Sequence, residues 1–223
     1  MGGASQIEAE LLLLNESNKF GPFQYYHLIS GVDMPIKSQD YIHQFFDSNI
    51  GKEFLGFVPF NEDIRQLIRY RIGRYWLLQQ YNRSNNAIQN KIRMMLNKIV
   101  RLLPRKMEGE YRKGSNWFSI TEKCTRYVLA NEKIIRKRYK YTFCSDEIFM
   151  QTLVYNNLDL RQNLFSYSDG THANMRYIDW SEGHPHVWTI EDKDKLQKSD
   201  KLFARKFSDQ NIEIVNWIKD YLL

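Results

Sequence analysis

The sequence has few cysteines, no long hydrophobic run, no internal repeat and no low-complexity linker. Its two cysteines, Cys124 and Cys144, form no CxxC pair, which argues against a disulfide scaffold and fits a reducing compartment. No apolar run approaches the length of a membrane span, and the first residues lack a signal-peptide pattern. These absences predict a cytoplasmic protein and leave peripheral attachment to a membrane open.

The composition is that of a globular protein with room for one buried core. The chain has 223 residues, of which 43% are hydrophobic and 14% aromatic. The 14 Tyr, 13 Phe and 5 Trp weakly favour a ligand with flat apolar faces, such as a sugar ring or a base. A net charge of +6 suits polyanions, including nucleic acid, anionic lipid and nucleotide phosphates, without choosing among them.

Short apolar strands alternate with amphipathic helices, which is the order typical of an α/β fold. Residues 61–112 differ from the rest because they are basic, helical in pattern and poor in glycine. We interpret them as a helical insertion within a single domain spanning 1–223. The expected helices cover 7–14, 38–46, 122–131, a segment starting at 145, 189–198 and 208–223, and the expected strands cover 23–29, 54–60 and 114–120.

Residues 141–153 carry the most specific chemical signal. Ser145 is placed to be a helix N-cap, with Asp146 and Glu147 in the first turn. The helix N-terminus favours an ionised carboxylate, and such a carboxylate can accept a proton from a substrate hydroxyl. Acidic residues are common in first turns for the dipole alone, so the spacing by itself favours a purely structural explanation.

The patterns for a metal site are weak. Asp192 and Asp194 have D-x-D spacing, but they follow Thr189 in what reads as a helix start, whereas a working D-x-D lies at the exposed end of a strand. His184 and His186 flank a proline and have no third ligand at a recognisable spacing. We therefore predict no metal.

The patterns for other catalytic classes are also absent. The sequence has no P-loop, no G-x-G-x-x-G and no G-x-S-x-G motif. Asp146 and Glu147 are adjacent on a helix and diverge, so they do not form the facing pair of a glycosidase. A single carboxylate fits a single displacement, in which it deprotonates an attacking hydroxyl while a leaving group departs. Positive charge nearby is then needed to stabilise that leaving group. Arg205 and Lys206, held between apolar residues in Leu202–Phe207, could supply it, although cations at a helix end are equally common.

Basic residues offer a second class of function. Arg136–Arg138 and the arginines of 65–83 could form a nucleic-acid footprint, but acidic residues interrupt them and no nucleic-acid-binding motif accompanies them. Solvated helix faces are the better explanation, and we predict no nucleic-acid partner.

Four segments together resemble one family, the core-2/I-branching β-1,6-N-acetylglucosaminyltransferases, which include the peptide xylosyltransferases. Residues 28–37 are similar to its "LxSGxDxPIK" segment, 114–118 to "GSxWF", 144–147 to "SPDE" and 202–207 to "LFARKF". Each motif is weak alone. Their order over nearly the whole chain, with about 61–108 unmatched, makes the resemblance strong.

The resemblance implies a GT-A-like α/β fold with a mixed sheet flanked by helices, and an inverting, metal-independent enzyme that uses a nucleotide-sugar donor. It implies Glu147 as the general base and Lys206 with Arg205 on the donor diphosphate. It also implies that loops containing Gly31, Asp33, Gly114 and Ser115 border the donor and acceptor site. The residues it implies as acceptor contacts are Tyr177, Trp180 and Glu53.

The sequence departs from the family in two places. Trp188 stands where the family has a second diphosphate-binding arginine, and His186, Arg176 or Arg205 could take its role. Residues 2–8 resemble a segment that normally follows the first strands of the fold, so we expect the first βα units of the nucleotide-binding half to be missing.

The resulting hypothesis is transfer of N-acetylglucosamine from UDP-GlcNAc to a hydroxyl of a glycan or glycoconjugate acceptor. A UDP-xylose:protein serine xylosyltransferase-like enzyme is the alternative within the family. A truncated, inactive carbohydrate-binding remnant is the alternative outside catalysis.

Overall fold

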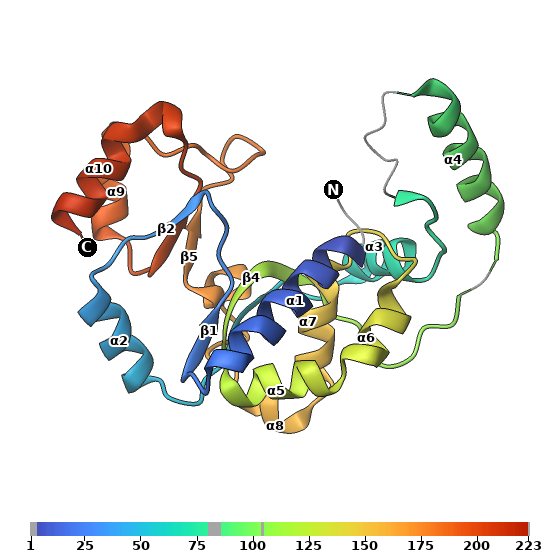
Figure 1. Cartoon of the computed structure of the whole chain (residues 1–223), viewed down its shortest axis with the longest axis horizontal. Helices are drawn as coiled ribbons and strands as arrows, with labels where there is room; N and C mark the ends of the chain where they lie inside the picture. The colour runs from blue at the N-terminus through green and yellow to red at the C-terminus, as the bar shows by residue number, and fades with distance from the viewer. Residues whose placement is uncertain (1–3, 80–85, 104, 223) are drawn as a thin grey trace.

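The computed structural model of the chain describes residues 4–79, 86–103 and 105–222 and has α/β architecture, as the sequence predicts (Figure 1). The helices are α1 (Ala4–Phe20), α2 (Gln39–Ser48), α3 (Glu62–Ile72), α4 (Ala87–Val100), α5 (Glu122–Ala130), α6 (Glu132–Tyr139), α7 (Asp146–Tyr155), α8 (Leu158–Gln162), α9 (Lys193–Lys198) and α10 (Ile212–Tyr221), with short 3-10 turns η2 (Gly170–Asn174), η3 (Ile190–Asp192) and η4 (Asp209–Asn211). The strands are β1 (Tyr25–His27), β2 (Asp33–Pro35), β3 (Phe54–Phe57), β4 (Gly114–Thr121), β5 (Arg176–Ile178) and β6 (Phe203–Arg205).

The strands divide between two three-stranded sheets. The first has the order β1-β4-β3 and is antiparallel, with Tyr26 opposite Ile120 and Leu55 opposite Phe118. The second has the order β2-β6-β5, in which β2 is antiparallel and β5 parallel to β6. The mixed pairing that the resemblance implies is therefore confined to the second sheet.

The largest core lies between the first sheet and helices α1, α5, α6 and α7. Helix α7 is almost wholly buried, which explains its continuous apolar run Ile148-Phe149-Met150. A second core surrounds the fully buried Trp188 and joins the second sheet to α9 and α10. Aromatic residues connect the two sheets, because Phe46 of α2, Phe54 of β3 and Phe203 of β6 belong to one buried cluster.

Two glycines allow a close approach beside β4. A Cβ on Gly114 would lie 1.8 Å from the carbonyl oxygen of Gly56, and a Cβ on Gly56 would lie 2.7 Å from that of Thr171. No side chain fits at either position without moving backbone. Gly114 is the first residue of β4, and its lack of a side chain lets β4 pass this close to Gly56 of β3.

Local capping signals predict the starts of α2 and α5 to within one residue, whereas α1, α9 and α10 begin three or four residues from the expected positions. The Ser38 and Thr121 hydroxyls accept hydrogen bonds from the amides of Tyr41 and Cys124, as N-cap residues do. Ser145 precedes α7 as expected but makes no capping hydrogen bond. It is buried, and its Oγ instead accepts a hydrogen bond from the Thr142 hydroxyl at 2.7 Å.

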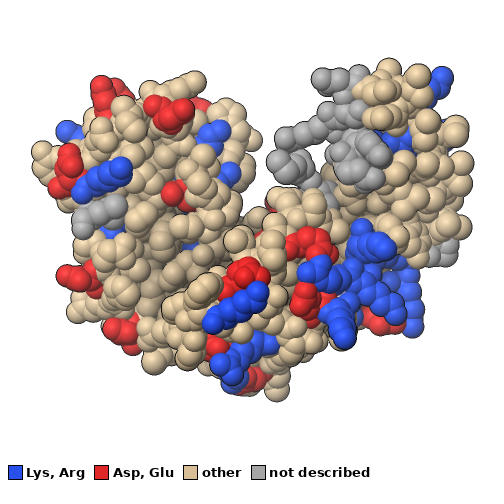
Figure 2. Space-filling view, in the orientation of Figure 1, with Lys and Arg blue, Asp and Glu red and all other residues tan. Residues whose placement is uncertain are grey.

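The helical insertion predicted at 61–112 contains α3 and α4, and its residues 80–85 and 104 lie outside the described part of the chain. Helix α4 stands apart from the body at one end of the molecule (Figure 1). Helix α4 and the residues up to 103 that follow it are here called the arm. The space-filling view shows a hollow between the arm and the lobe that contains α9 and α10 (Figure 2). Across residues 4–79, 86–103 and 105–222, the structure contains no helix with the length and apolar character needed to cross a membrane.

Candidate active site

A pocket of about 870 Å³ opens where the start of β4, the N-terminus of α7, the end of β5 and the end of β6 converge. Its size is suited to a small-molecule ligand. The predicted site residues that line it are Gly114, Ser115, Glu147, Tyr177, Trp180 and Arg205. Segments that are distant in sequence thus bring the proposed base, a proposed diphosphate ligand and the proposed acceptor aromatics to one place.

Glu147 lies in this pocket between two cations. Arg71 Nη1 of α3 donates to Glu147 Oε2 at 2.7 Å, and Lys113 Nζ lies 3.1 Å from the same oxygen. Burial acts to raise the pKa of the Glu147 carboxyl, but the charges and hydrogen bonds of Lys113 and Arg71 outweigh it and the pKa is lowered. Glu147 is therefore ionised at neutral pH. Arg71 and Lys113 both contact Oε2, so Oε1 is the oxygen that can accept a hydrogen bond from a substrate hydroxyl.

Asp146 lines the same pocket but has the opposite electrostatic character. Burial, followed by the neighbouring charge of Glu147, raises the pKa of the Asp146 carboxyl to about 6. Its buried Oδ1 makes no hydrogen bond with the described residues. The two adjacent acids differ because Glu147 forms ion pairs with Arg71 and Lys113, whereas for Asp146 the same two charges are too weak to offset its burial.

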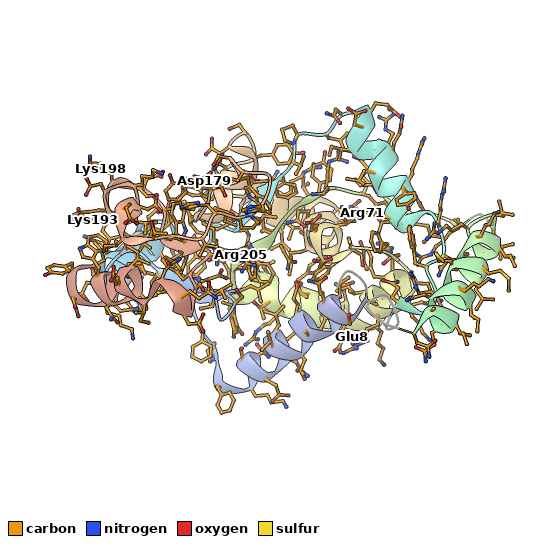
Figure 3. The ribbon with its side chains drawn as sticks, turned by 90° about the horizontal axis from the view of Figure 1, so that it is seen from above. Glu8, Arg71, Asp179, Lys193, Lys198 and Arg205 are labelled. Carbon is orange, nitrogen blue, oxygen red and sulfur yellow. The ribbon has the colours of Figure 1, made fainter. Side chains whose placement is uncertain are left out.

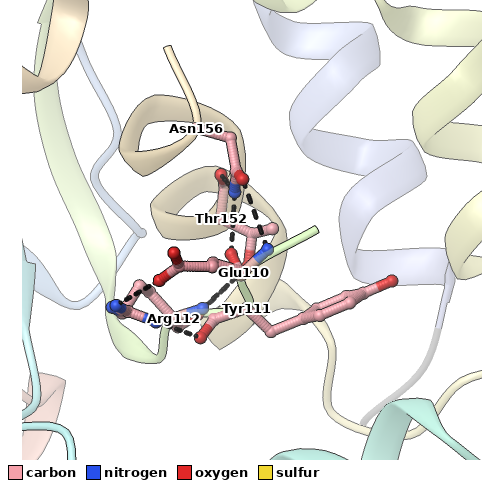
Figure 4. A network of polar contacts seen from close by, with 5 residues as sticks. All are labelled: Glu110, Tyr111, Arg112, Thr152 and Asn156. Atoms are coloured by element: carbon pink, nitrogen blue, oxygen red, sulfur yellow. Dashed lines mark hydrogen bonds and ion pairs between the residues drawn. The ribbon is translucent and has the colours of Figure 1, made fainter. Parts of the chain in front are cut away.

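The position of Lys113 follows from the way α7 holds the segment before β4 (Figure 4). Thr152 Oγ1 accepts a hydrogen bond from the Arg112 amide at 3.1 Å and donates to the Arg112 carbonyl at 3.3 Å. Asn156 Nδ2 donates to the Glu110 carbonyl at 2.7 Å, and its Oδ1 accepts from the Glu110 amide. The side chains of Thr152 in α7 and of Asn156 at its C-cap thus hydrogen-bond the segment before β4, and they hold Lys113 close to Glu147 at the start of α7.

Arg205 lines the pocket from the end of β6, and Figure 3 shows it apart from Arg71. Its Nη1 contacts Asp33 Oδ1 at 3.0 Å and the Ser30 hydroxyl at 2.7 Å, and its guanidinium lies 4.8 Å from the centre of the Trp117 ring. Asp33 therefore positions Arg205 and does not itself line the pocket.

The resemblance left His186, Arg176 and Arg205 as candidates for the second diphosphate-binding cation expected at the position of Trp188. His186 lies outside the pocket lining, and its Nε2 contacts Asp192. Trp188 itself is fully buried against Tyr177 and His186, so it belongs to the core. Arg176 lines the pocket, but its guanidinium donates to Ser119 Oγ and to backbone carbonyls, and burial lowers its pKa to about 9. Arg205 is the candidate whose guanidinium lies both in the pocket and near its surface.

Aromatic rings form one wall of the pocket. Tyr177 and Trp180 line it as expected, and Trp117 of β4 joins them. Trp180 is 59% exposed, which leaves a flat apolar face available to a ligand. Exposed aromatic faces of this kind suit the apolar faces of sugar rings.

Four predicted residues lie outside the lining. Gly31 is exposed, with nothing within 4 Å of an added Cβ, and Asp33 acts through Arg205. Lys206 follows Arg205 but is not part of the pocket lining. Its backbone amide donates a hydrogen bond to the His186 carbonyl, and its carbonyl accepts one from the Trp188 amide. Glu53 is 1% exposed and accepts hydrogen bonds from the Thr121 amide and hydroxyl, below the N-terminus of α5.

The D-x-D acids also lie elsewhere. Asp192 is buried and contacts His186 Nε2 at 2.8 Å, Lys195 Nζ at 3.0 Å and the Thr189 amide. Burial acts to raise the pKa of Asp192, but these partners outweigh it and lower the pKa to about 2. The described residues contain no group of three acidic, histidine or cysteine side chains arranged to hold a metal ion.

Sequence reasoning missed Arg71, Lys113 and Trp117, and it assigned no site role to Asp146. Arg71 lies 76 residues from Glu147, and its helical stretch contains several arginines with no feature that distinguishes it. Lys113 immediately precedes the "GSxWF" segment and Trp117 lies inside it. Their closeness to this motif was the only sign in the sequence that they belong to the site. The polar residues of α7, Thr152 and Asn156, gave no sign of their role.

The sequence model of the Core-2/I-Branching enzyme family matches residues 1–200 of the chain. None of the curated proteins compared with the chain matches it significantly.

Proposed function

The chain belongs to the Core-2/I-branching enzyme family, a family of glycosyltransferases, and we propose that it moves N-acetylglucosamine from UDP-GlcNAc to a hydroxyl of a glycan acceptor, with inversion and without a metal ion. The observation that carries the proposal is the ionised Glu147, held by two cations in a pocket that also contains Arg205 and an exposed aromatic wall. Family membership implies a nucleotide-sugar donor and a glycan acceptor in general, and the ionised Glu147 supports direct attack by an acceptor hydroxyl.

In this mechanism, Glu147 accepts the proton of the acceptor hydroxyl while that oxygen attacks the anomeric carbon of the donor. The bond from the anomeric carbon to the UDP oxygen breaks, and the diphosphate leaves with the bonding electrons. A single displacement of this kind inverts the anomeric configuration. Arg71 and Lys113 hold Oε2, so the base is fixed while Oε1 receives the proton.

The leaving diphosphate gains negative charge, and Arg205 in the pocket lining is proposed to stabilise it. Lys206 is proposed to assist, with its side chain turned toward a bound diphosphate. Trp180 and Tyr177 are proposed to stack on the acceptor sugar. Glu53 is left out of the proposal, because its carboxylate is buried against Thr121.

The test combines donor binding with sugar transfer. Calorimetry with UDP should show binding by the parent protein and a clear loss of affinity in Arg205→Met and Lys206→Met. Lys193→Met, an exposed change on α9, serves as the matched control (Figure 3). Unchanged affinity in both pocket variants would remove the diphosphate assignment.

Transfer assays with UDP-GlcNAc and UDP-xylose, each in EDTA with a panel of oligosaccharide and peptide acceptors, then distinguish the donors. GlcNAc transfer that survives EDTA supports the proposal. Xylose transfer onto a serine peptide would replace the donor, and sugar binding without any transfer would favour an inactive carbohydrate-binding protein. The proposal also includes peripheral contact with a membrane.

A further inference from the structure

Helix α4 presents an apolar face to solvent. Its residues are Ile88, Ile92, Met95 and Ile99, and together with Leu102 in the turn that follows the helix they are here called the apolar row. Their spacing of three and four places them along one side of the helix. Each is between 46% and 82% exposed, although large aliphatic side chains on a surface helix ordinarily face the core.

The polar side of α4 is the side that faces the body. Asn97 is buried, and its side-chain amide donates to the Leu77 carbonyl at 3.0 Å while its Oδ1 accepts from the Leu77 amide at 2.8 Å. The Arg101 guanidinium lies 3.8 Å from the centre of the Trp76 ring. The helix is therefore fixed by polar and cationic contacts, and these contacts hold the apolar row outward.

The charge on this arm has one sign. From Ala87 to Leu103 the sequence contains four Lys or Arg residues and no Asp or Glu. Lys91 and Lys98 are exposed and lie three residues after Ile88 and Met95, along the border of the apolar row. Figure 2 shows the arm as uncharged surface with some Lys or Arg and no Asp or Glu on the face in view.

More cationic surface adjoins the base of the arm. Arg69, Arg74 and Arg105 line a groove of about 860 Å³ between α3 and the chain that follows α4. In Figure 2, Lys and Arg residues also gather over α6. An anionic partner would thus meet favourable charge at the row and beside it.

We propose that α4 docks onto the surface of an anionic lipid bilayer, with the apolar row inserted between headgroups and Lys91 and Lys98 at the level of lipid phosphates or carboxylates. An apolar helix face bordered by cations is the pattern of interfacial helices that lie in the plane of a membrane. The helix has 14 residues, which suits this placement. A second copy of the chain is a poorer partner, because two cationic arms would repel each other.

The proposal does not rest on the proposed function, since binding to vesicles can be measured without sugar transfer. The full chain is mixed with vesicles of phosphatidylcholine alone or with 30% phosphatidylserine, and the bound fraction is read by flotation. We expect binding only to the anionic vesicles, weakening with added salt. Lys91→Gln and Lys98→Gln should each weaken it about fivefold.

The apolar contribution is tested with matched double variants. Ile88→Ser with Ile99→Ser removes two exposed residues of the row, and Ile50→Ser with Leu158→Ser removes two equally exposed aliphatic residues elsewhere. The first should abolish vesicle binding and the second should leave it unchanged, with both variants keeping the parent's thermal unfolding. Absent vesicle binding, equal loss in both variants, or a dimer that only the first variant disrupts would overturn the proposal.

Discussion

Glu53 offers the sharpest test of how this fold handles a buried charge. Its carboxyl is almost completely excluded from water and accepts hydrogen bonds from the Thr121 amide at 2.9 Å and the Thr121 hydroxyl at 2.5 Å. Burial raises the pKa of Glu53, the Thr121 hydrogen bonds oppose it, and the net result is a pKa of about 7 compared with 4.5 ordinarily.

The sign of the effect on stability follows from linkage. The folded protein binds the Glu53 proton more tightly than the unfolded chain, so the contribution of Glu53 to stability is fully present below pH 4.5 and is lost as the pH rises through 7. A rise in pKa from 4.5 to about 7 corresponds to about 3 kcal/mol, of which most is lost between pH 4 and pH 9. Glu53→Gln carries no charge and removes this dependence.

The assay is urea unfolding of the parent and of Glu53→Gln at several pH values from 4 to 9. The difference in unfolding free energy between the two proteins should shift by about 3 kcal/mol in favour of the variant as the pH rises. The other titrating groups cancel in this difference because both proteins contain them. A difference that stays constant over the whole range would refute the account of Glu53.

Three further changes test the scaffold and the pocket. Gly114→Ala should lower the unfolding free energy by at least about 1–3 kcal/mol, because its Cβ would collide with the Gly56 carbonyl. Gly31→Ala is the control, because nothing lies within 4 Å of its added Cβ. Equal melting temperatures for the two variants would contradict this. Thr152→Val removes both hydrogen bonds to Arg112 and should cost about 1–3 kcal/mol in urea unfolding, as well as slowing turnover; an unchanged stability would argue against the α7 anchor. Trp180→Ala should raise the KM for the acceptor without lowering the melting temperature, and an unchanged KM would exclude its stacking role.

Local signals in the sequence predicted local structure. Ser38 and Thr121 mark helix starts because a capping hydrogen bond involves residues only three apart. Ser145 had the same signal, but Thr142 offered its hydroxyl a different partner inside the fold. Strands of three or four residues, such as β2 and β6, carry no information about their partners, so the division into two sheets could not be anticipated.

The candidate site was predictable where a motif marked it. Glu147 and Arg205 came from segments that resemble the family, and the structure places both in one pocket. The cations that set the charge of Glu147 come from α3 and from the segment before β4, and only tertiary packing brings them together. Glu53 is the contrasting case, because the resemblance implies a contact with the acceptor, whereas the structure buries its side chain beneath α5.

The most direct test of the catalytic account is the rate of sugar transfer by Glu147→Gln, measured beside the parent and beside Glu62→Gln, an exposed glutamate of α3. The glutamine cannot accept the acceptor proton, so transfer should fall by about 10²–10⁴-fold while UDP affinity and the melting temperature confirm an intact pocket. Glu62→Gln should retain the parent rate. A Glu147→Gln variant that transfers sugar within about twofold of the parent would contradict the account.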